Sequence, residues 1–99
     1  MFTRSRVVVV GAGNICNGFL FHAEKDKLLE DFDFLVLDKD PEALNIKKRH
    51  FPFITIHPFD ADKADLSLIL KKDDWVLSLL PARYHKTLAE KCLLKECHL

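Results

Sequence analysis

The feature that most constrains this chain is a run of four valines that ends at a glycine turn. Val7 to Val10 is followed by Gly11-Ala12-Gly13, and apolar residues then recur at helical spacing from Asn14 onward. A continuous β-branched run predicts a strand buried on both faces of a parallel sheet, and the glycines after it predict a tight turn into a helix. The chain is therefore expected to begin with a strand, a glycine turn and a helix.

The same alternation continues along the chain. Strands are predicted at 6–10, 33–37, 53–57 and 75–80, and helices at 14–27, 41–49, 66–70 and 84–96. Asp40 and Pro41 are the expected N-cap and first residue of the second helix. Right-handed crossovers between these elements would build one open parallel sheet. The predicted fold is α/β and Rossmann-like, with sheet order 3-2-1-4 and helices on both faces. It corresponds to the first half of a doubly wound domain.

Each predicted helix has an apolar face that should meet the sheet. The expected inward residues are Ile15, Phe19, Leu20 and Ala23 in the first helix, Ala43, Leu44 and Ile46 in the second, Leu66, Leu68, Ile69 and Leu70 in the third, and Leu88, Ala89, Cys92 and Leu93 in the last. Apolar residues at this spacing lie on one side of a helix.

Composition excludes several classes of partner. Fifteen basic and fifteen acidic residues cancel, so no nucleic-acid or anionic-membrane partner is expected. The valine run is too short for a signal peptide or a membrane span, which predicts a cytoplasmic protein. Cys16, Cys92 and Cys97 have no paired spacing, so neither a disulfide framework nor a zinc site is expected.

The glycine turn has the chemistry of a phosphate-binding loop. Gly11 would allow the tight turn, Gly13 would let the backbone approach a pyrophosphate, and the opening N–H groups of the helix would hold its charge. Residues at the third fingerprint position are normally Gly or Ala, and here the residue is Cys16. The predicted cofactor contacts in this turn are Gly11, Ala12, Gly13, Asn14 and Ile15. The alternative is a turn with a purely structural role.

Asp38 stands at the end of the second predicted strand, where an acidic residue binds the adenosine ribose in dinucleotide-binding domains. A carboxylate there accepts hydrogen bonds from the ribose hydroxyls and repels a 2′-phosphate, which favours NAD over NADP. Lys39 is included in the predicted site and would partly offset this charge. The alternative is that Asp38 only caps the next turn.

The ends of the third and fourth strands complete the predicted site. Asp60 and Ala61 follow the third strand, where an adenine ring usually lies, although an N-cap role for Asp60 or Asp62 is at least as well supported. The end of the fourth strand lies where the strand order reverses and ligands bind, and the residues expected there are Leu79, Leu80 and Pro81. No catalytic residue is assigned, because His85 at a helix start is more often a cap or surface group.

Two stretches resemble the N-terminal NAD(P)-binding portion of the saccharopine dehydrogenase family. They are Val7 to Ile15 (VVVVGAGNI) and the segment from Asp74 to Cys92 that contains Ser-Leu-Leu-Pro. The Asp60-Ala61 step is also similar to the family's. The resemblance implies an oxidoreductase that transfers hydride between nicotinamide and an amino-acid or imine-type substrate, with the substrate domain following this segment.

The expected organisation is one partial NAD(P)-binding domain over 1–99 that is not catalytic by itself. The alternative function is a regulatory nucleotide-sensing module without catalysis. A third hypothesis is association, because the outer side of the fourth strand would lack a neighbour. A homodimer or a missing C-terminal domain would then cover it.

Overall fold

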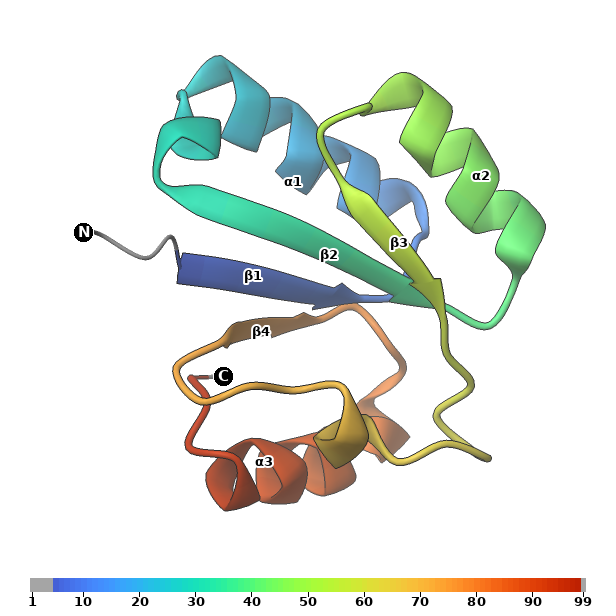
Figure 1. Cartoon of the computed structure of the whole chain (residues 1–99). Coiled ribbons are helices and arrows are strands. Elements are labelled where there is room, and N and C mark those ends of the chain that lie inside the picture. Colours follow the sequence, from blue (N-terminus) through green and yellow to red (C-terminus); the bar gives the residue numbers. More distant parts are fainter. Residues whose placement is uncertain (1–4, 99) are drawn as a thin grey trace.

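The valine run forms a central strand of the sheet in the computed structural model, which describes residues 5–98 (Figure 1). The strands are β1 (Ser5–Val10), β2 (Phe32–Asp38), β3 (Thr55–Pro58) and β4 (Trp75–Ser78). They lie in the order β3-β2-β1-β4, and their pairings are parallel. The predicted Rossmann-like sheet and its strand order are confirmed.

Side chains of β1 alternate between the two faces of the sheet and belong to two separate cores. Val8 and Val10 pack in one hydrophobic cluster, and Val9 packs in the other. β1 lies between two strands, with Val8 opposite Leu35 on β2 and Val76 on β4. A strand that is apolar on both sides is stable only where both faces of its sheet are covered.

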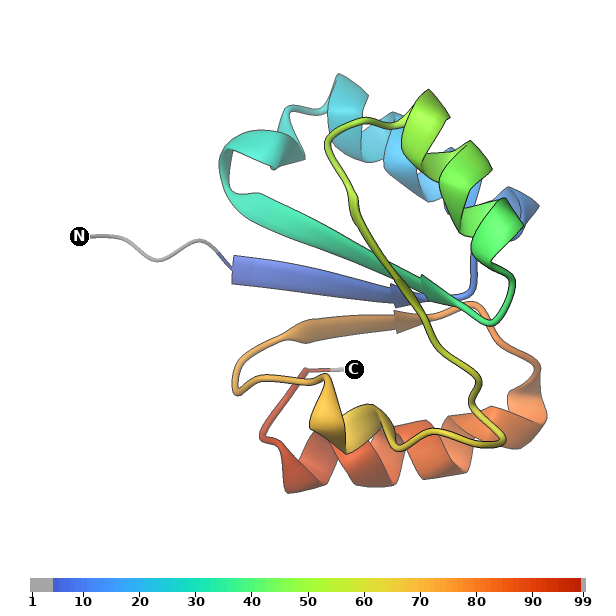
Figure 2. The same cartoon turned by 45° about the vertical axis from the view of Figure 1, so that its right-hand side comes forward.

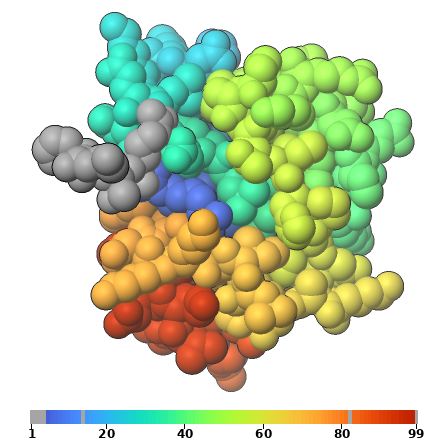
Figure 3. Space-filling view, viewed as in Figure 1, coloured from blue at the N-terminus to red at the C-terminus, as the bar shows by residue number. Residues whose placement is uncertain are grey.

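Helices cover both faces, as predicted. α1 (Asn14–Lys25) and α2 (Pro41–His50) lie on one face, and α3 (His85–Leu94) lies on the other (Figure 1). The turned view shows the same separation, with the arrowheads of β1 and β4 side by side (Figure 2). In the space-filling view only a small patch of β1 is visible between the segments that flank it (Figure 3). α1 follows β1 and α2 follows β2, so both helices start at the carboxyl edge of the sheet.

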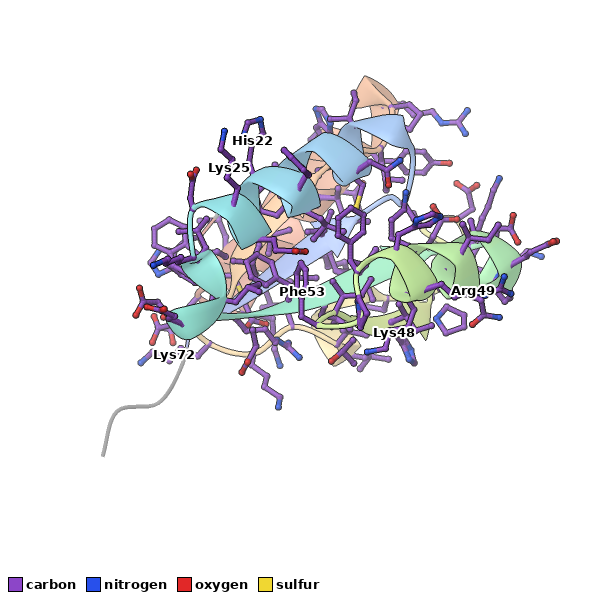
Figure 4. The ribbon with its side chains drawn as sticks, turned by 90° about the horizontal axis from the view of Figure 1, so that it is seen from above. His22, Lys25, Lys48, Arg49, Phe53 and Lys72 are labelled. Atoms are coloured by element: carbon purple, nitrogen blue, oxygen red, sulfur yellow. The ribbon has the colours of Figure 1, made fainter. Side chains whose placement is uncertain are left out.

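Both ends of α2 have stabilising contacts. Asp40 is the N-cap, its carboxylate accepts the backbone N–H two residues further on at 3.0 Å, and Pro41 is the first helical residue, all as predicted. The last turn is basic, which complements the negative end of the helix dipole. Lys48 and Arg49 are labelled in the view from above (Figure 4), and Lys48 Nζ donates to the carbonyl of Pro52 at 2.7 Å.

The inward face of α2 differs from the prediction. Ile46 was expected to point inward and is 44% exposed, whereas Lys47 is 7% exposed. Lys47 lies three residues after the buried Leu44, so it shares that side of the helix, and Ile46 does not. The lysine stem fills the space between the helices, and its ammonium donates to Asn17 Oδ1 on α1.

The predicted third helix is wrong. The connection from β3 to β4 holds only a short 3-10 turn, η2 (Leu66–Leu68), in which Leu68 is 84% exposed. Asp65 caps this turn by accepting the N–H of Ser67 at 3.0 Å. The apolar residues of this segment are nearly consecutive, and such a run does not define one helical face.

The last helix is shorter than predicted and begins after a 3-10 turn, η3 (Ala82–Tyr84). Leu93, expected on its inner face, is 79% exposed. The helix ends at Leu94, Glu96 beyond its C-cap has a left-handed φ of 56°, and the N–H of Cys97 donates to the carbonyl of Cys92 at 2.8 Å. This pattern is a Schellman C-cap, which explains why the helix stops there.

The outer strands are shorter than predicted, because each pairs along its length with a neighbouring strand on one side only. β3 begins at Thr55 rather than Phe53, and β4 ends at Ser78 rather than Leu80. On the outer side of β4, His98 forms a single parallel bridge with Trp75, and their rings stack at 4.4 Å. Among residues 5–98, no helix has both the length and the apolar character that crossing a bilayer requires.

Candidate functional site

The turn between β1 and α1 needs glycine at its first position. Gly11 has a φ of 114°, which residues with a side chain rarely adopt, and a Cβ there would lie 3.2 Å from Leu79 Cβ. Gly13 has an ordinary φ of −79°, and a Cβ added to it would meet nothing within 4 Å. The fold therefore requires Gly11, whereas the space beside Gly13 is open to a ligand.

The first turn of α1 is available to bind an anion. Gly13 is its N-cap, no described side chain caps it by a hydrogen bond, and the first turn has no acidic residue. The opening N–H groups and the positive end of the helix dipole can therefore hold a phosphate. Ile15 was expected to pack inward and is instead 73% exposed beside this turn. The side chain of Asn14 lies outside the described part of the structure.

Asp38 lies against the glycine turn. Its Oδ2 accepts a hydrogen bond from the N–H of Ala12 at 2.9 Å, and its Oδ1 accepts one from the N–H of Asp40 at 2.9 Å. The carboxylate thus fixes the turn and also caps the bend that precedes α2. A carboxylate has about four lone-pair sites, so acceptor capacity remains for the hydroxyls of a sugar.

A pocket of about 160 Å³ opens beside Asp38 at the carboxyl edge of the sheet. Six residues of the predicted site line it: Asp38, Lys39, Asp60, Ala61, Leu80 and Pro81. Sites for whole small ligands usually measure about 300–1,000 Å³, so this pocket fits one end of such a ligand. Leu79 does not line it, because its side chain packs against Gly11 and the core beneath α1.

The comparisons with known proteins agree with this geometry. Residues 7–99 match the family model described as the saccharopine dehydrogenase NADP binding domain. The chain belongs to this family. The resemblance drawn from the sequence is thereby confirmed. The comparison with curated proteins found no match.

Two solved structures share the fold of this family domain. Apo saccharopine dehydrogenase (L-Glu forming) from Saccharomyces cerevisiae matches with a TM-score of 0.76 and 18% identity, over 94% of this chain and 20% of that one. The WlbA dehydrogenase from Chromobacterium violaceum, in complex with NADH and UDP-GlcNAcA, matches with a TM-score of 0.68 and 25% identity, over 93% of this chain and 25% of that one. The chain thus spans a fifth to a quarter of these proteins and is a dinucleotide-binding domain of the saccharopine dehydrogenase-like type.

Three polar or charged pocket residues of this family domain were not assigned to the site from the sequence. They are Asp62, Arg83 and Tyr84. The Tyr84 hydroxyl lies 3.0 Å from both carboxylate oxygens of Asp62 and accepts a hydrogen bond from Arg83 Nη2 at 2.7 Å. That hydrogen bond raises the pKa of Arg83 above its ordinary value. Their position in the sequence could have indicated them, since each residue follows the carboxyl end of a strand by a few residues.

Cys16 occupies the third fingerprint position without disturbing the turn. Its side chain is fully buried and packs in the cluster that contains Val9 and Leu44. Burial raises the pKa of the Cys16 thiol, and the charge of nearby Lys47 partly opposes that increase. A thiol is therefore tolerated where the fingerprint normally has a smaller residue.

His85 and Ser78 lie just beyond the turn, on the α3 side. The Nε2 atom of His85 is 3.1 Å from the carbonyl oxygen of Leu80, which ties the start of α3 to the segment that follows β4. The Oγ atom of Ser78 is buried and has no hydrogen-bond partner among the described residues. A polar atom left unsatisfied at this crevice is compatible with a ligand that approaches it.

Proposed function

We propose that this chain binds the adenosine and pyrophosphate of NADP(H) for a saccharopine dehydrogenase-like oxidoreductase that acts on an amino-acid or imine-type substrate. The observation that carries the proposal is the uncapped start of α1 behind an open Gly13, with Asp38 beside it. Family membership over residues 7–99 supports it independently. When bound, the cofactor supplies the hydride chemistry.

Each residue of the predicted site has a role in this proposal. The backbone of Gly11, Ala12, Gly13, Asn14 and Ile15 surrounds the pyrophosphate, because these residues form the turn and the uncapped first turn of α1. Asp38 holds the turn in place through Ala12 and accepts a ribose hydroxyl. Asp60, Ala61, Leu80 and Pro81 line the space for the adenine. Leu79 keeps Gly11 in position from the opposite side.

The choice of NADP over NAD departs from the expectation based on Asp38 alone. Both oxygens of that carboxylate accept backbone N–H groups, whose partial positive charges offset part of its negative charge. Lys39 lines the same pocket, is exposed, and has no ion-pair partner among the described residues. A 2′-phosphate could therefore be neutralised beside Asp38. The description of the family model as NADP binding supports the same choice.

The domain is proposed to act as one part of a larger active site. The pocket holds only one end of a dinucleotide, and the similar structures are four to five times longer than the segment that matches. The groups that contact the nicotinamide and the substrate would then lie outside residues 1–99. We accordingly expect this chain to bind cofactor and to show no turnover by itself.

Calorimetric titration of the folded chain with NADPH, NADH and ATP tests the proposal. We expect NADPH to bind more tightly than NADH, and both more tightly than ATP. A chain with aspartate in place of Gly13 is the control and should bind none of them. The absence of heat at about 1 mM ligand, where even weak sites fill, would contradict cofactor binding. Preference for ATP would favour a regulatory nucleotide sensor.

A further inference from the structure

Two connections that are far apart in the sequence meet over the adenosine end of the pocket. One follows β3 and contributes Asp62, and the other follows β4 and contributes Arg83 and Tyr84. The hydrogen bonds from Tyr84 to Asp62 join them. The described part of the chain shows no other side-chain hydrogen bond between these two connections.

Tyr84 is held in place from both sides. Asp62 is positioned by the tight turn after β3, in which its N–H donates to Asp60 Oδ1 at 2.9 Å. The N–H groups of Lys63 and Ala64 donate to the carbonyl of Asp60 at 3.0 and 2.8 Å, which makes this turn well ordered. The hydrogen bonds to Asp62 thus link the Tyr84 ring to a hydrogen-bonded turn.

The guanidinium of Arg83 lies over the Tyr84 ring. Its guanidinium carbon is 4.7 Å from the centroid of the Tyr84 ring, and one nitrogen donates to the Tyr84 hydroxyl. A planar guanidinium that is stacked on one aromatic ring still has a second face available. Because Arg83 has no salt bridge among the described residues, a carboxylate does not pull it out of this arrangement.

We propose that Arg83, held by Tyr84 and Asp62, stacks on the adenine ring of the bound dinucleotide. The inference rests on the proposed function and assigns a specificity-determining residue within its site. The lining of the pocket that contains Arg83 also includes the apolar side chains of Phe59 and Leu80, against which a flat base can pack. The Asp62 carboxylate lies next to this surface and disfavours a phosphate there.

The test is a calorimetric titration of the full chain with ADP and with adenosine 2′,5′-bisphosphate. The variants are Arg83→Gln, Arg83→Lys and, as a matched control, Lys86→Gln. Lys86 is an exposed cation on α3 that does not line the pocket. Thermal unfolding of each variant establishes that it folds, which is expected because Arg83 is exposed.

We expect Arg83→Gln to bind both nucleotides about three- to thirty-fold more weakly than the unchanged chain, the range for a cation stacked on an aromatic ring. Lysine should not restore binding, because it keeps the charge and lacks the planar face. Lys86→Gln should bind normally.

Equal binding by the unchanged chain and by Arg83→Gln would overturn the stacking role and leave the proposed function intact. A loss confined to the bisphosphate, restored by lysine, would mean that Arg83 binds the 2′-phosphate, which also overturns stacking. Failure of the unchanged chain to bind either nucleotide would refute both the stacking role and the proposed function.

Discussion

Replacing Gly11 by alanine should destabilise the domain by several kcal/mol. The φ of 114° at this position costs a residue with a Cβ about 1–3 kcal/mol. The new Cβ would also lie 3.2 Å from Leu79 Cβ, and such overpacking typically costs about 1–3 kcal/mol. The expected loss is about 2–6 kcal/mol out of the roughly 5–15 kcal/mol that stabilises a domain.

The matched control is Gly18→Ala in α1. Gly18 is exposed and helical, and a Cβ added to it would meet nothing within 4 Å. Glycine inside a helix is about 0.5–1 kcal/mol less favourable than alanine, so this variant should be more stable than the unchanged chain. The two variants make the same chemical change, and their opposite signs isolate the backbone strain and the contact with Leu79.

Urea unfolding followed by far-ultraviolet circular dichroism measures both effects, and the slope m tests whether the transition stays two-state. For a domain of this size, about 2–6 kcal/mol corresponds to a fall in Tm of roughly 10–50 °C. If Gly11→Ala lay within about 0.5 kcal/mol of the unchanged chain, the backbone at residue 11 could relax without cost. The argument that the fold requires glycine there would then be wrong.

Three further predictions concern the same region. Gly13→Asp should raise stability by a few tenths of a kcal/mol through a better N-cap, which urea unfolding measures. It should also abolish NADPH binding in calorimetry, because its carboxylate would compete with the phosphate. Lys47→Met should leave stability unchanged or raise it by up to about 2 kcal/mol, since it removes a buried charge that is hydrogen-bonded to the neutral amide of Asn17. A clear loss of stability in urea would show that the ammonium stabilises the helix pair. Burial raises the pKa of the Cys16 thiol above its ordinary 9.0, so the folded state retains that proton longer than the unfolded state. The contribution of Cys16 to stability should therefore be constant below pH 9.0 and fall as the pH rises further, and Cys16→Ala should reduce this alkaline decline in unfolding measured at several pH values.

The parts of the fold that the sequence predicted well have local signals. β1 and β2 are continuous apolar runs, the turn after β1 is marked by glycine, and the start of α2 is marked by Asp40 and Pro41. Each signal reflects a short-range physical requirement, such as a positive φ or an N-cap, that does not depend on distant residues. The order of the strands then followed from the handedness of the crossovers.

The sequence-based predictions failed where the burial of a side chain depends on residues that are distant in the sequence. Leu68 and Ile46 are apolar and exposed, whereas Lys47 is charged and buried, because the neighbouring helix leaves space for a long stem with a polar end. Residue type alone predicts the opposite in all three cases. The contact between Tyr84 and Asp62 was equally hidden, since it joins residues 22 positions apart through hydrogen bonds that leave no periodic pattern.

The starts of α1 and α2 show how the fold separates stability from binding. Both helices begin at the carboxyl edge of the sheet, and the chain caps α2 with Asp40 and places Gly13 at the same position of α1. Glycine at an N-cap costs only a few tenths of a kcal/mol relative to aspartate. That small cost keeps the N–H groups of α1 open, and an acidic cap would close them to any phosphate. Asp38 contacts both starts, through Ala12 and Asp40, so one carboxylate holds the binding turn and the structural turn in register.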